Sequence, residues 1–340
     1  MEMQRVTVIT LVCGDRWKFL SQVVEAVMKD EHVIKMVIVD NASYNKEELI
    51  RGLEKYGDRI VLLHQEKNLG PGTGFNIGLK YARGVDCEFV FLLDDDEIPE
   101  EGFVSKFLEI KKLFGERKVV LLSNKVNIFG TQRVFYEPWD RSKIRYGVFF
   151  EVFSFSKVLN FFRLLLGINK KTYSVDESQF TPLVPVESFA YGGAFIPIEA
   201  VRENPLPDTT FRMYGDDGEY SWSMFKLGYV PYLCYSPKLY DIDLSVGAGS
   251  NISGYFDPAT KPYRVYYHLK SGIRISRIHR RKSKVMLFLN IFFWNLGLCI
   301  LGFFKYGINS ATWNRAKIVA KAVYAGYFID TPPPEEVKLP

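Results

Sequence analysis

Apolar and polar residues alternate in blocks along the first hundred residues, and the period of the pattern changes from block to block. The runs VTVITLVC (6–13) and KMVIVD (35–40) are short and β-branched, which predicts buried strands. The stretch WKFLSQVVEAVMKD (17–30) instead has its apolar residues at helical spacing, on one face. Strand and helix alternate four times up to residue 93, which predicts a parallel α/β sheet with helices on both faces.

The strand predicted for CEFVFLL (87–93) ends in four acids, Asp94, Asp95, Asp96 and Glu97. Adjacent carboxylates repel one another, so such a cluster is costly without a cation or a proton. A solvated loop, or a helix start where acids favour the positive end of the dipole, would also explain it. Asp40 ends another predicted strand, and ligands of such sheets bind outside the carboxyl ends of the strands. We therefore interpret Asp40 and the acids as one site.

Residues that leave a strand alternate in direction, which predicts that Asp94 and Asp96 share one side and that Asp95 faces elsewhere. Two carboxylates on one side can hold a hard divalent cation, Mn²⁺ or Mg²⁺, that bridges to substrate phosphates. Asp40 can accept hydrogen bonds from a base or a ribose. Its alternative role is to cap the helix that follows.

The glycine-rich segment NLGPGTGFNIG (68–78) lacks both GK[ST] and the GxGxxG spacing. It is therefore neither a nucleotidase-type phosphate loop nor a dinucleotide-binding fingerprint. We expect Asn68 and Gly70 to shape a tight turn that lets the backbone approach a ligand, and a purely structural turn is the alternative.

A second acidic group stands in FRMYGDDGEYSWSMFKLGY (211–229), where Asp216, Asp217 and Glu219 precede an apolar helical pattern. Acids at a helix start often serve only the helix dipole. The functional alternative is a general base, a carboxylate that removes the proton of an attacking hydroxyl.

Composition predicts a folded protein, since 47% of the 340 residues are hydrophobic and 15% are aromatic. The length predicts one large domain with an appendage. Four cysteines are scattered without a CxxC pair, which is typical of reduced thiols in a cytoplasmic protein rather than a disulfide framework.

The net charge of +5 is concentrated near the carboxyl terminus, since residues 258–329 hold thirteen Lys and Arg and no acid. Within them, residues 285–304 form a stretch of twenty without a charge, which is long enough to span a membrane. Asn290, Asn295 and the lack of a second clear span favour peripheral attachment to anionic lipid headgroups instead. No nucleic-acid-binding motif accompanies the basic residues, so nucleic acid is not an expected partner.

The chain resembles the family 2 glycosyltransferases, which have the GT-A fold. Five stretches occur in the order of that family: VTVITLVCGDR, VDNAS, NLGPGTGFNIG, LLDDDEIP and YGDDGEYSWSMFKLGY. YGGAFIPIEA (191–200) resembles the segment that precedes the base, and the most similar subgroup is the rhamnosyl- and galactofuranosyl-transferase-like set. The resemblance implies a GT-A domain over residues 1–250, with a variable acceptor-side insertion at 122–186. The basic and apolar residues that follow predict a helical membrane-associating extension over 251–340.

The resemblance also implies roles for individual residues. Asp217 would be the base of an inverting displacement, and Asp94 and Asp96 would form the metal-binding DXD motif for Mn²⁺ or Mg²⁺. Where members of the subgroup often have a metal-binding histidine, this chain has Tyr240-Asp241. Either Asp241 or Asp243 replaces the histidine as a ligand, or this ligand is missing. Donor contacts would come from Asp40, Asn68, Gly70, Asp94 and Asp95. Acceptor contacts would come from Gly192, Gly193, Asp216 and Glu219.

The expected function is metal-dependent inverting transfer of a sugar from a UDP- or dTDP-sugar to a hydroxyl of a glycan or lipid-linked acceptor. We expect it in cell-surface polysaccharide synthesis, at the cytoplasmic face of the membrane. A sugar nucleotidyltransferase should lack a motif such as YGDDGEY, and an all-helical prenyl synthase should lack the strand CEFVFLL. The remaining alternative is a non-catalytic, membrane-bound scaffold that binds sugar nucleotides. The donor sugar, the acceptor, the linkage and the oligomeric state do not follow from the sequence.

Overall fold

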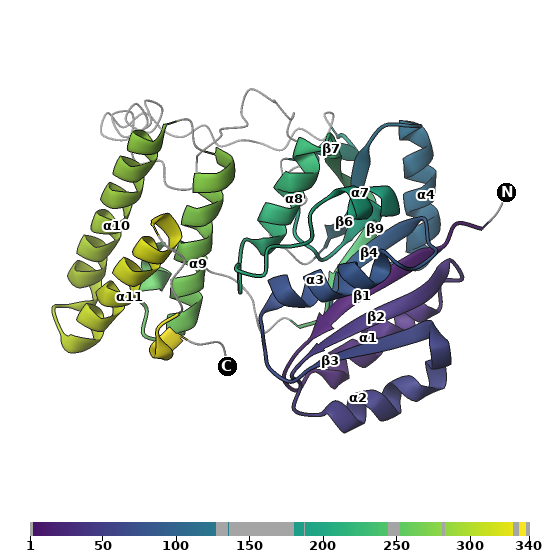
Figure 1. Cartoon of the computed structure of the whole chain (residues 1–340), viewed down its shortest axis with the longest axis horizontal. Helices are drawn as coiled ribbons and strands as arrows, with labels where there is room; N and C mark the ends of the chain where they lie inside the picture. The colour runs from purple at the N-terminus through teal and green to yellow at the C-terminus, as the bar shows by residue number, and fades with distance from the viewer. Residues whose placement is uncertain are drawn as a thin grey trace. The chain divides into compact units, whose positions relative to one another are not determined.

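The structure is a computed structural model that describes residues 3–126, 135, 180–186, 188–243, 252–280, 283–328 and 333–337. The chain divides into two compact units (Figure 1). We call the first the sheet unit; it comprises Met1–Asp140, Asp176–Arg212 and Asp216–Val246. The second, the helical unit, comprises Arg141–Val175, Met213–Gly215 and Gly247–Pro340.

One mixed sheet forms the centre of the sheet unit. The described strands are β1 (Val6–Val12), β2 (Val33–Asn41), β3 (Ile60–Gln65), β4 (Phe89–Asp94), β5 (Glu97–Pro99), β6 (Val119–Lys125), β7 (Leu183–Pro185), β8 (Ala194–Pro197) and β9 (Val230–Asp241). Their order across the sheet is β3-β2-β1-β4-β8-β6-β9-β5, and β7 pairs with β9.

The predicted parallel arrangement is confirmed for β1 to β4, but the complete sheet is mixed. β8 runs antiparallel to both β4 and β6, and β5 and β7 run antiparallel to β9. The sequence pattern did not reveal these pairings because β5, β7 and β8 are only three or four residues long. A sheet of this kind excludes the all-helical synthase. Most of the insertion predicted at 122–186 lies outside the described residues, and its described ends belong to β6 and β7.

Helices cover both faces of the sheet. Those described in the sheet unit are α1 (Trp17–Met28), α2 (Lys46–Leu53), η1 (Glu54–Arg59), α3 (Pro71–Ala82), α4 (Phe103–Phe114), α7 (Ile198–Glu203) and α8 (Asp216–Lys226). Alternate strand residues face opposite sides, so Val8 packs with α1 and α4 whereas its neighbour Ile9 packs with α3, α7 and α8.

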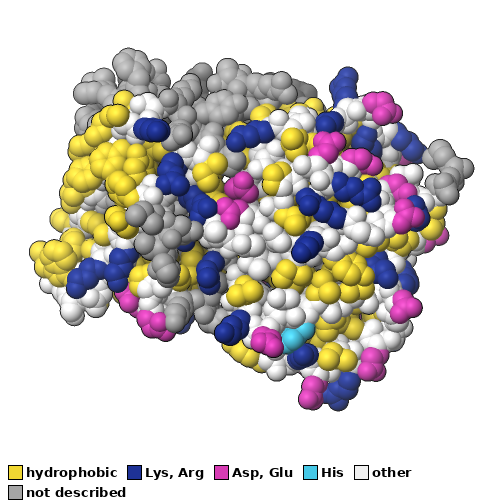
Figure 2. All heavy atoms as spheres, in the orientation of Figure 1, with side chains coloured by type: hydrophobic (Ala, Val, Ile, Leu, Met, Phe, Trp, Pro, Cys, Tyr) yellow, Lys and Arg dark blue, Asp and Glu magenta, His cyan; other side chains and the backbone are white. Residues whose placement is uncertain are grey.

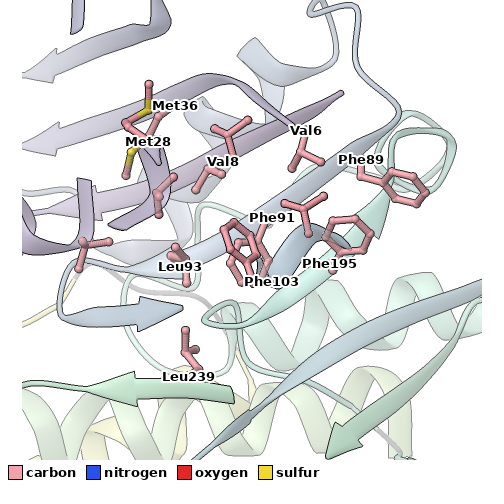
Figure 3. Close-up of a cluster of buried hydrophobic side chains, with 14 of the residues drawn as sticks. Val6, Val8, Met28, Met36, Phe89, Phe91, Leu93, Phe103, Phe195 and Leu239 are labelled. Atoms are coloured by element: carbon pink, nitrogen blue, oxygen red, sulfur yellow. The ribbon is translucent and has the colours of Figure 1, made fainter. Parts of the chain in front are cut away.

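Aromatic rings fill the core on the α1 and α4 side (Figure 3). The ring centroids of Phe91 and Phe103 are 4.9 Å apart, and those of Phe107 and Phe195 are 4.6 Å apart in a stacked arrangement. These rings tie β4 and β8 to α4. Close packing of this kind fixes the carboxyl end of β4, from which the acidic cluster extends.

The described elements of the helical unit are η6 (Ile252–Tyr255), α9 (Pro262–Ile275), the π-helical turn η7 (Ser276–Arg280), α10 (Lys284–Tyr306), α11 (Ser310–Tyr327) and η8 (Glu335–Val337). Side-chain caps begin two of these helices, since Met286 N donates to Ser283 Oγ at 3.4 Å and Thr312 N donates to Asn309 Oδ1 at 3.0 Å. Gly307, at φ 79°, follows the last residue of α10. The core of this unit comes from α9, α10 and α11, with Tyr266, Ile291 and Val319 each about 1% exposed.

Candidate active site

The acidic cluster occupies the turn between β4 and β5. Asp94 ends β4 with half of its side chain exposed, at 50%, whereas Asp95 is only 8% exposed as a residue. Glu97 opens β5 and pairs in register with Asp241 of β9. This pairing brings a carboxylate from far along the chain to the cluster, at the edge where the sequence predicts the site.

Arg16, between β1 and α1, holds three of the carboxylates together. Its Nε donates to Asp95 Oδ2 at 2.7 Å, its Nη1 to Asp243 Oδ2 at 2.7 Å and its Nη2 to Asp96 Oδ2 at 2.5 Å. The prediction that Asp95 faces away from Asp96 is therefore wrong. Asp95 and Asp96 belong to a turn rather than a strand, so the alternation of strand side chains does not apply to them.

Lys125, the last residue of β6, is the second cation of the site. Its Nζ pairs with Glu97 Oε1 and lies 3.8 Å from Asp94 Oδ2. Glu97 Oε2 in turn accepts a hydrogen bond from Asp94 N at 3.0 Å. A side chain at Gly192 would place its Cβ 2.2 Å from Glu97 Oε2, so glycine at this position makes room for the pair.

Gly193 also has a backbone role beside the cluster. Its φ is 88°, a conformation that favours glycine, and its N–H donates to Leu92 O at 2.8 Å. Gly192 and Gly193 therefore shape the wall of the acidic site. Their contact with an acceptor stays a prediction.

Burial and mutual repulsion raise the pKa of several of these acids. Burial first, and then the charges of Asp96 and Asp94, raise the pKa of Asp95 to about 7 despite its bond to Arg16. The pKa of Glu97 rises to about 7 through burial and the charge of Asp94. Burial, with Asp94 and Asp241, raises the pKa of Asp96 as well. At this edge of the sheet, burial and the repulsion among the carboxylates thus raise these pKa values more than the two cations, Arg16 and Lys125, lower them.

This donor set fits a hard divalent cation in chemistry, because it is rich in carboxylate oxygens that repel one another. Within the described part of the chain, no three His, Cys, Asp or Glu side chains are grouped to hold a metal ion. At this edge Arg16 is bonded to Asp96 Oδ2. A cation on Asp96 would share that carboxylate with the guanidinium or displace it.

The predicted base lies at the start of α8. Asp216 is 2% exposed, and burial followed by the charge of Asp217 raises its pKa to about 8. Asp217 is partly exposed, and its Oδ1 accepts from Gly218 N at 2.7 Å. Its pKa is raised by burial and by the charge of Asp94. Asp94 acts on Asp216 as well, so the structure brings the acidic turn and the start of α8 to one place.

Glu219, also predicted on the acceptor side, makes a contact within its own helix. Its Oε1 accepts a hydrogen bond from Ser223 Oγ, one turn later, at 3.0 Å. Asp217, in contrast, is partly exposed, and the hydrogen bond that the structure shows to its carboxylate comes from the adjacent backbone N–H of Gly218.

Asp40 is fully buried at the end of β2. Ser43 N donates to its Oδ1 at 2.8 Å, and its Oδ2 lies 2.6 Å from Nδ1 of His64 on β3. It does not cap α2, which begins at Lys46. The buried carboxylate orients His64, whose side chain is 29% exposed. A nucleotide contact by Asp40 stays a prediction, and His64 is the neighbouring side chain that solvent reaches.

The glycine-rich turn has the structural role that the sequence left open. Asn68 Oδ1 accepts from Asn41 Nδ2 at 2.9 Å and from Gly70 N at 3.0 Å. A Cβ on Gly70, whose φ is 84°, would lie 1.7 Å from Arg212 O. Asn68 and Gly70 thus fix the start of α3 against its neighbours, and their donor contacts stay predictions.

Sequence reasoning missed Arg16, Lys125 and His64. All three follow or end strands at the same edge of the sheet as the acids, and Arg16 was visible in CGDR directly after the first predicted strand. The role of Lys125 depends on the place of β6 beside β8 and β9, which the sequence pattern did not reveal.

Comparison with known proteins finds a match of residues 7–156 to the family model Glycosyl transferase family 2. Glycosyltransferase GlyG of Streptococcus pneumoniae serotype 4 is 29% identical over 89 residues, which are 26% of this chain and 29% of the relative. Uncharacterized glycosyltransferase MJ1057 of Methanocaldococcus jannaschii is 27% identical over 101 residues, 29% of this chain and 34% of the relative. The matched stretch thus spans about a third of these relatives.

Solved structures share the fold at low identity. TarS 1–349 of S. aureus in complex with UDP-GlcNAc aligns with a TM-score of 0.51 and 12% identity, over 95% of this chain and 81% of that one. GalNAc-T7 with UDP, GalNAc and Mn²⁺ aligns with a TM-score of 0.50 and 12% identity, over 96% of this chain and 59% of that one. The predicted fold, an α/β sheet of the GT-A type flanked by helices and followed by carboxyl-terminal helices, is confirmed.

Proposed function

We propose that the chain transfers a sugar from a nucleotide-sugar donor to an acceptor hydroxyl, since residues 7–156 match the family model Glycosyl transferase family 2. The observation that carries the proposal is the acidic turn at the carboxyl end of β4, where Arg16 bonds both Asp95 and Asp96, together with the second acidic group, which includes Asp217, at the start of α8. One group suits the diphosphate and its cation. The other supplies a base within the same edge of the sheet.

Asp217 is the proposed base of an inverting single displacement. It is partly exposed, so an acceptor hydroxyl can reach it, and its raised pKa brings its proton affinity closer to that of a base working near neutral pH. Asp216 beside it, with a pKa of about 8, is protonated at neutral pH and adds little negative charge. Inversion requires no nucleophile from the protein.

Asp94 and Asp96 would hold the metal, Mn²⁺ or Mg²⁺, which supplies charge stabilisation to the leaving diphosphate. Asp241 is the proposed third ligand, because it pairs in register with Glu97 of the acidic turn. Asp243, which is bonded to Arg16 as Asp96 is, remains the other candidate. Arg16 and Lys125 keep the acids partly neutralised in the absence of a donor, which limits their repulsion.

The substrates of the proposed reaction are a nucleotide-sugar donor and an acceptor with a free hydroxyl. A UDP-sugar or a dTDP-sugar is the donor, and a rhamnosyl- or galactofuranosyl-like transfer is the class that the sequence motifs favour. The acceptor is a hydroxyl of a glycan or of a lipid-linked glycan in cell-surface polysaccharide synthesis. The S. aureus TarS structure carries UDP-GlcNAc, which is consistent with a uridine donor for a shared fold.

The test is donor turnover by the full chain. UDP- and dTDP-sugars are incubated singly with Mn²⁺, with Mg²⁺ or with a chelator, and the release of nucleoside diphosphate is measured. The proposal predicts release from one class of donor, and only with metal. Pyrophosphate release from a nucleoside triphosphate and a sugar 1-phosphate would instead identify a nucleotidyltransferase. Binding of a sugar nucleotide without turnover, with or without added acceptor glycans, would identify a scaffold.

A further inference from the structure

The polarity of α10 is the reverse of that of a helix in a water-soluble bundle. Every exposed residue between 285 and 304 is apolar. We call this set the α10 surface; it consists of Val285, Met286, Phe288, Leu289, Phe292, Phe293, Leu296, Ile300, Leu301 and Phe304. Figure 2 shows hydrophobic side chains gathered over the part of the molecule where Figure 1 draws α10.

The polar side chains of this helix point inward instead. The buried face comprises Leu287, Asn290, Ile291, Asn295, Leu298 and Gly302. Asn290 Nδ2 donates to Met286 O at 3.0 Å, and Asn295 Nδ2 donates to Ile291 O at 2.7 Å, so each amide satisfies a carbonyl of its own helix. A helix in contact with water places its polar residues outward. Inward polar groups and an outward apolar face are typical of contact with lipid.

Two exposed aromatic side chains, one in α11 and one directly after its last residue, extend the α10 surface at both ends. The ring centroids of Phe303 and Trp313 are 4.8 Å apart, and Trp313 is 53% exposed. At the other end, the rings of Phe288 and Phe328 are 6.4 Å apart, and Phe328 is 54% exposed. Ten exposed apolar side chains thus stand on one helix of 23 residues, and a large exposed apolar surface marks a site of contact with a partner or a membrane.

Basic residues flank the surface and no acid stands near it in sequence. Lys284 and Lys305, both exposed, begin and nearly end α10, with no charged residue between them. Residues 258–329 contain no Asp or Glu. An apolar face bounded by cations complements a bilayer whose headgroups are anionic, because lysine ammonium groups reach the headgroups while the apolar residues enter the acyl boundary.

We propose that α10 binds an anionic lipid bilayer in the plane of its surface, through the α10 surface. The helix is long and apolar enough to cross a membrane. It packs against α11, however, which exposes Lys317 and Lys321, and Lys321 pairs with Glu336 at 2.7 Å. These charges belong in water or at headgroup level, so α11 cannot follow α10 across the hydrocarbon. An in-plane helix satisfies both sets of side chains. The proposal does not depend on the chemistry proposed for the sheet unit.

Flotation on vesicles tests the proposal with the full chain. The vesicles are phosphatidylcholine with or without phosphatidylglycerol, at low and high salt. The variant Phe292→Ser/Ile300→Gln/Phe304→Ser should lose about tenfold or more of its partition to anionic vesicles. Its matched control, Ile50→Gln/Tyr81→Ser/Leu113→Gln, changes exposed apolar residues on helices of the sheet unit and should float like the parent. Equal flotation of both variants would overturn the proposal.

The charges give a second, independent arm. Lys284→Gln/Lys305→Gln should weaken flotation several-fold at low salt and much less at high salt, because salt screens the attraction to the headgroups. Quenching of tryptophan fluorescence by brominated lipids should fall in Trp313→Phe, which removes an exposed ring at the edge of the α10 surface. Brominated lipids should not quench the tryptophan fluorescence of Phe292→Ser/Ile300→Gln/Phe304→Ser as they do that of the parent. If this variant no longer floats but is quenched as strongly as the parent, direct contact between the α10 surface and lipid is contradicted.

Two other outcomes would also overturn the in-plane model. Resistance of membrane-bound protein to alkaline carbonate, together with insensitivity to both sets of substitutions, would identify a spanning helix. A lipid-free dimer that dissociates in Phe292→Ser/Ile300→Gln/Phe304→Ser would show that a second copy covers the α10 surface. Sedimentation of parent and variant without vesicles distinguishes this case, and equal thermal melting of the two confirms that the variant is folded.

Discussion

The sheet unit and the helical unit place their apolar residues in opposite ways. In α1 the apolar positions Leu20, Val23 and Val27 are fully buried against the sheet. In α10 the apolar residues are on both sides, and those at Ile300 and Phe304 are 59% and 90% exposed. Spacing reveals the buried face of a helix only when its other face is polar. An apolar helix with an unpartnered face indicates a partner outside the chain.

The two units also carry surplus charge of opposite sign. The sheet unit gathers acids at one edge against Arg16 and Lys125, which leaves a surplus of negative charge. The helical unit has an acid-free stretch over residues 258–329. The first imbalance suits a cation and a diphosphate, and the second suits an anionic surface. In each unit, the charge that is left without an opposite charge within the unit therefore indicates the kind of partner that we expect.

The largest expected effect is on catalysis in the sheet unit. Asp217→Asn should lower donor turnover by about 100- to 10,000-fold, because an amide cannot accept the proton of the acceptor. Donor affinity should stay within a few-fold. Turnover assays and calorimetry of the same preparations measure the two quantities.

Glu219→Gln is the matched control, since Glu219 begins the same helix but bonds Ser223. It should retain most of the turnover. If Asp217→Asn keeps its turnover and Glu219→Gln loses it, the base is Glu219 and the assignment of Asp217 is wrong.

The next effect concerns stability at the acidic edge. Arg16→Gln should lower the free energy of unfolding by about 3 kcal/mol, because it leaves partly buried carboxylates without their cation. Arg16→Lys keeps the positive charge but not the guanidinium group that donates to three carboxylates, so it should lower the free energy of unfolding by less. Mn²⁺ should raise the melting temperature of Arg16→Gln more than that of the parent. An unchanged melting temperature in Arg16→Gln would show that the three ion pairs contribute nothing.

Two neighbours in α10 test whether its faces differ in the free chain. Ile291, 1% exposed, and Phe292, 50% exposed, are adjacent in sequence. Ile291→Ala should lower the free energy of unfolding by about 2–4 kcal/mol, whereas Phe292→Ala should change it by about 0.5 kcal/mol or less. Denaturant titration without lipid measures both. Equal losses would show that Phe292 is covered in solution.

The smallest effect is a pH dependence at Asp216. Its pKa rises from 3.8 to about 8 on folding, so the folded chain keeps a proton that the unfolded chain has lost. Stability from this group therefore falls as the pH rises through that interval. Asp216→Asn has no carboxyl group to titrate, so it should not lose stability in this way. The difference in free energy of unfolding between Asp216→Asn and the parent should therefore grow, in favour of the variant, by about 1 kcal/mol or more from about pH 5 to about pH 8. A difference independent of pH would contradict the raised pKa.

Local pattern predicted much of this molecule. Strands β1, β2 and β4 and helix α1 lie where the spacing of apolar residues predicted them, and α8 contains the helical pattern predicted after Asp216 and Asp217. The position of the acidic turn also followed from the sequence, because a buried strand must end before a run of acids. These features depend on residues that are close in sequence.

The partners of the acids did not follow from the sequence. Arg16 meets Asp95 across 79 residues and Asp243 across 227. Such contacts depend on the order of strands in the sheet, and β8 enters that order with only four residues. Side-chain direction in the turn at Asp95 and Asp96 likewise depends on the guanidinium between them. The outward face of α10 was not predictable either, because its apolar residues surround the helix.

The central claim is that donor chemistry belongs to the sheet unit and lipid binding to the α10 surface. One flotation gradient, with donor turnover measured in every fraction, tests it most directly. Asp217→Asn should float with anionic vesicles but show no turnover, and Phe292→Ser/Ile300→Gln/Phe304→Ser should stay at the bottom with the turnover of the parent. Failure of Asp217→Asn to float, or loss of turnover in the α10 variant with a soluble donor, would contradict the separation.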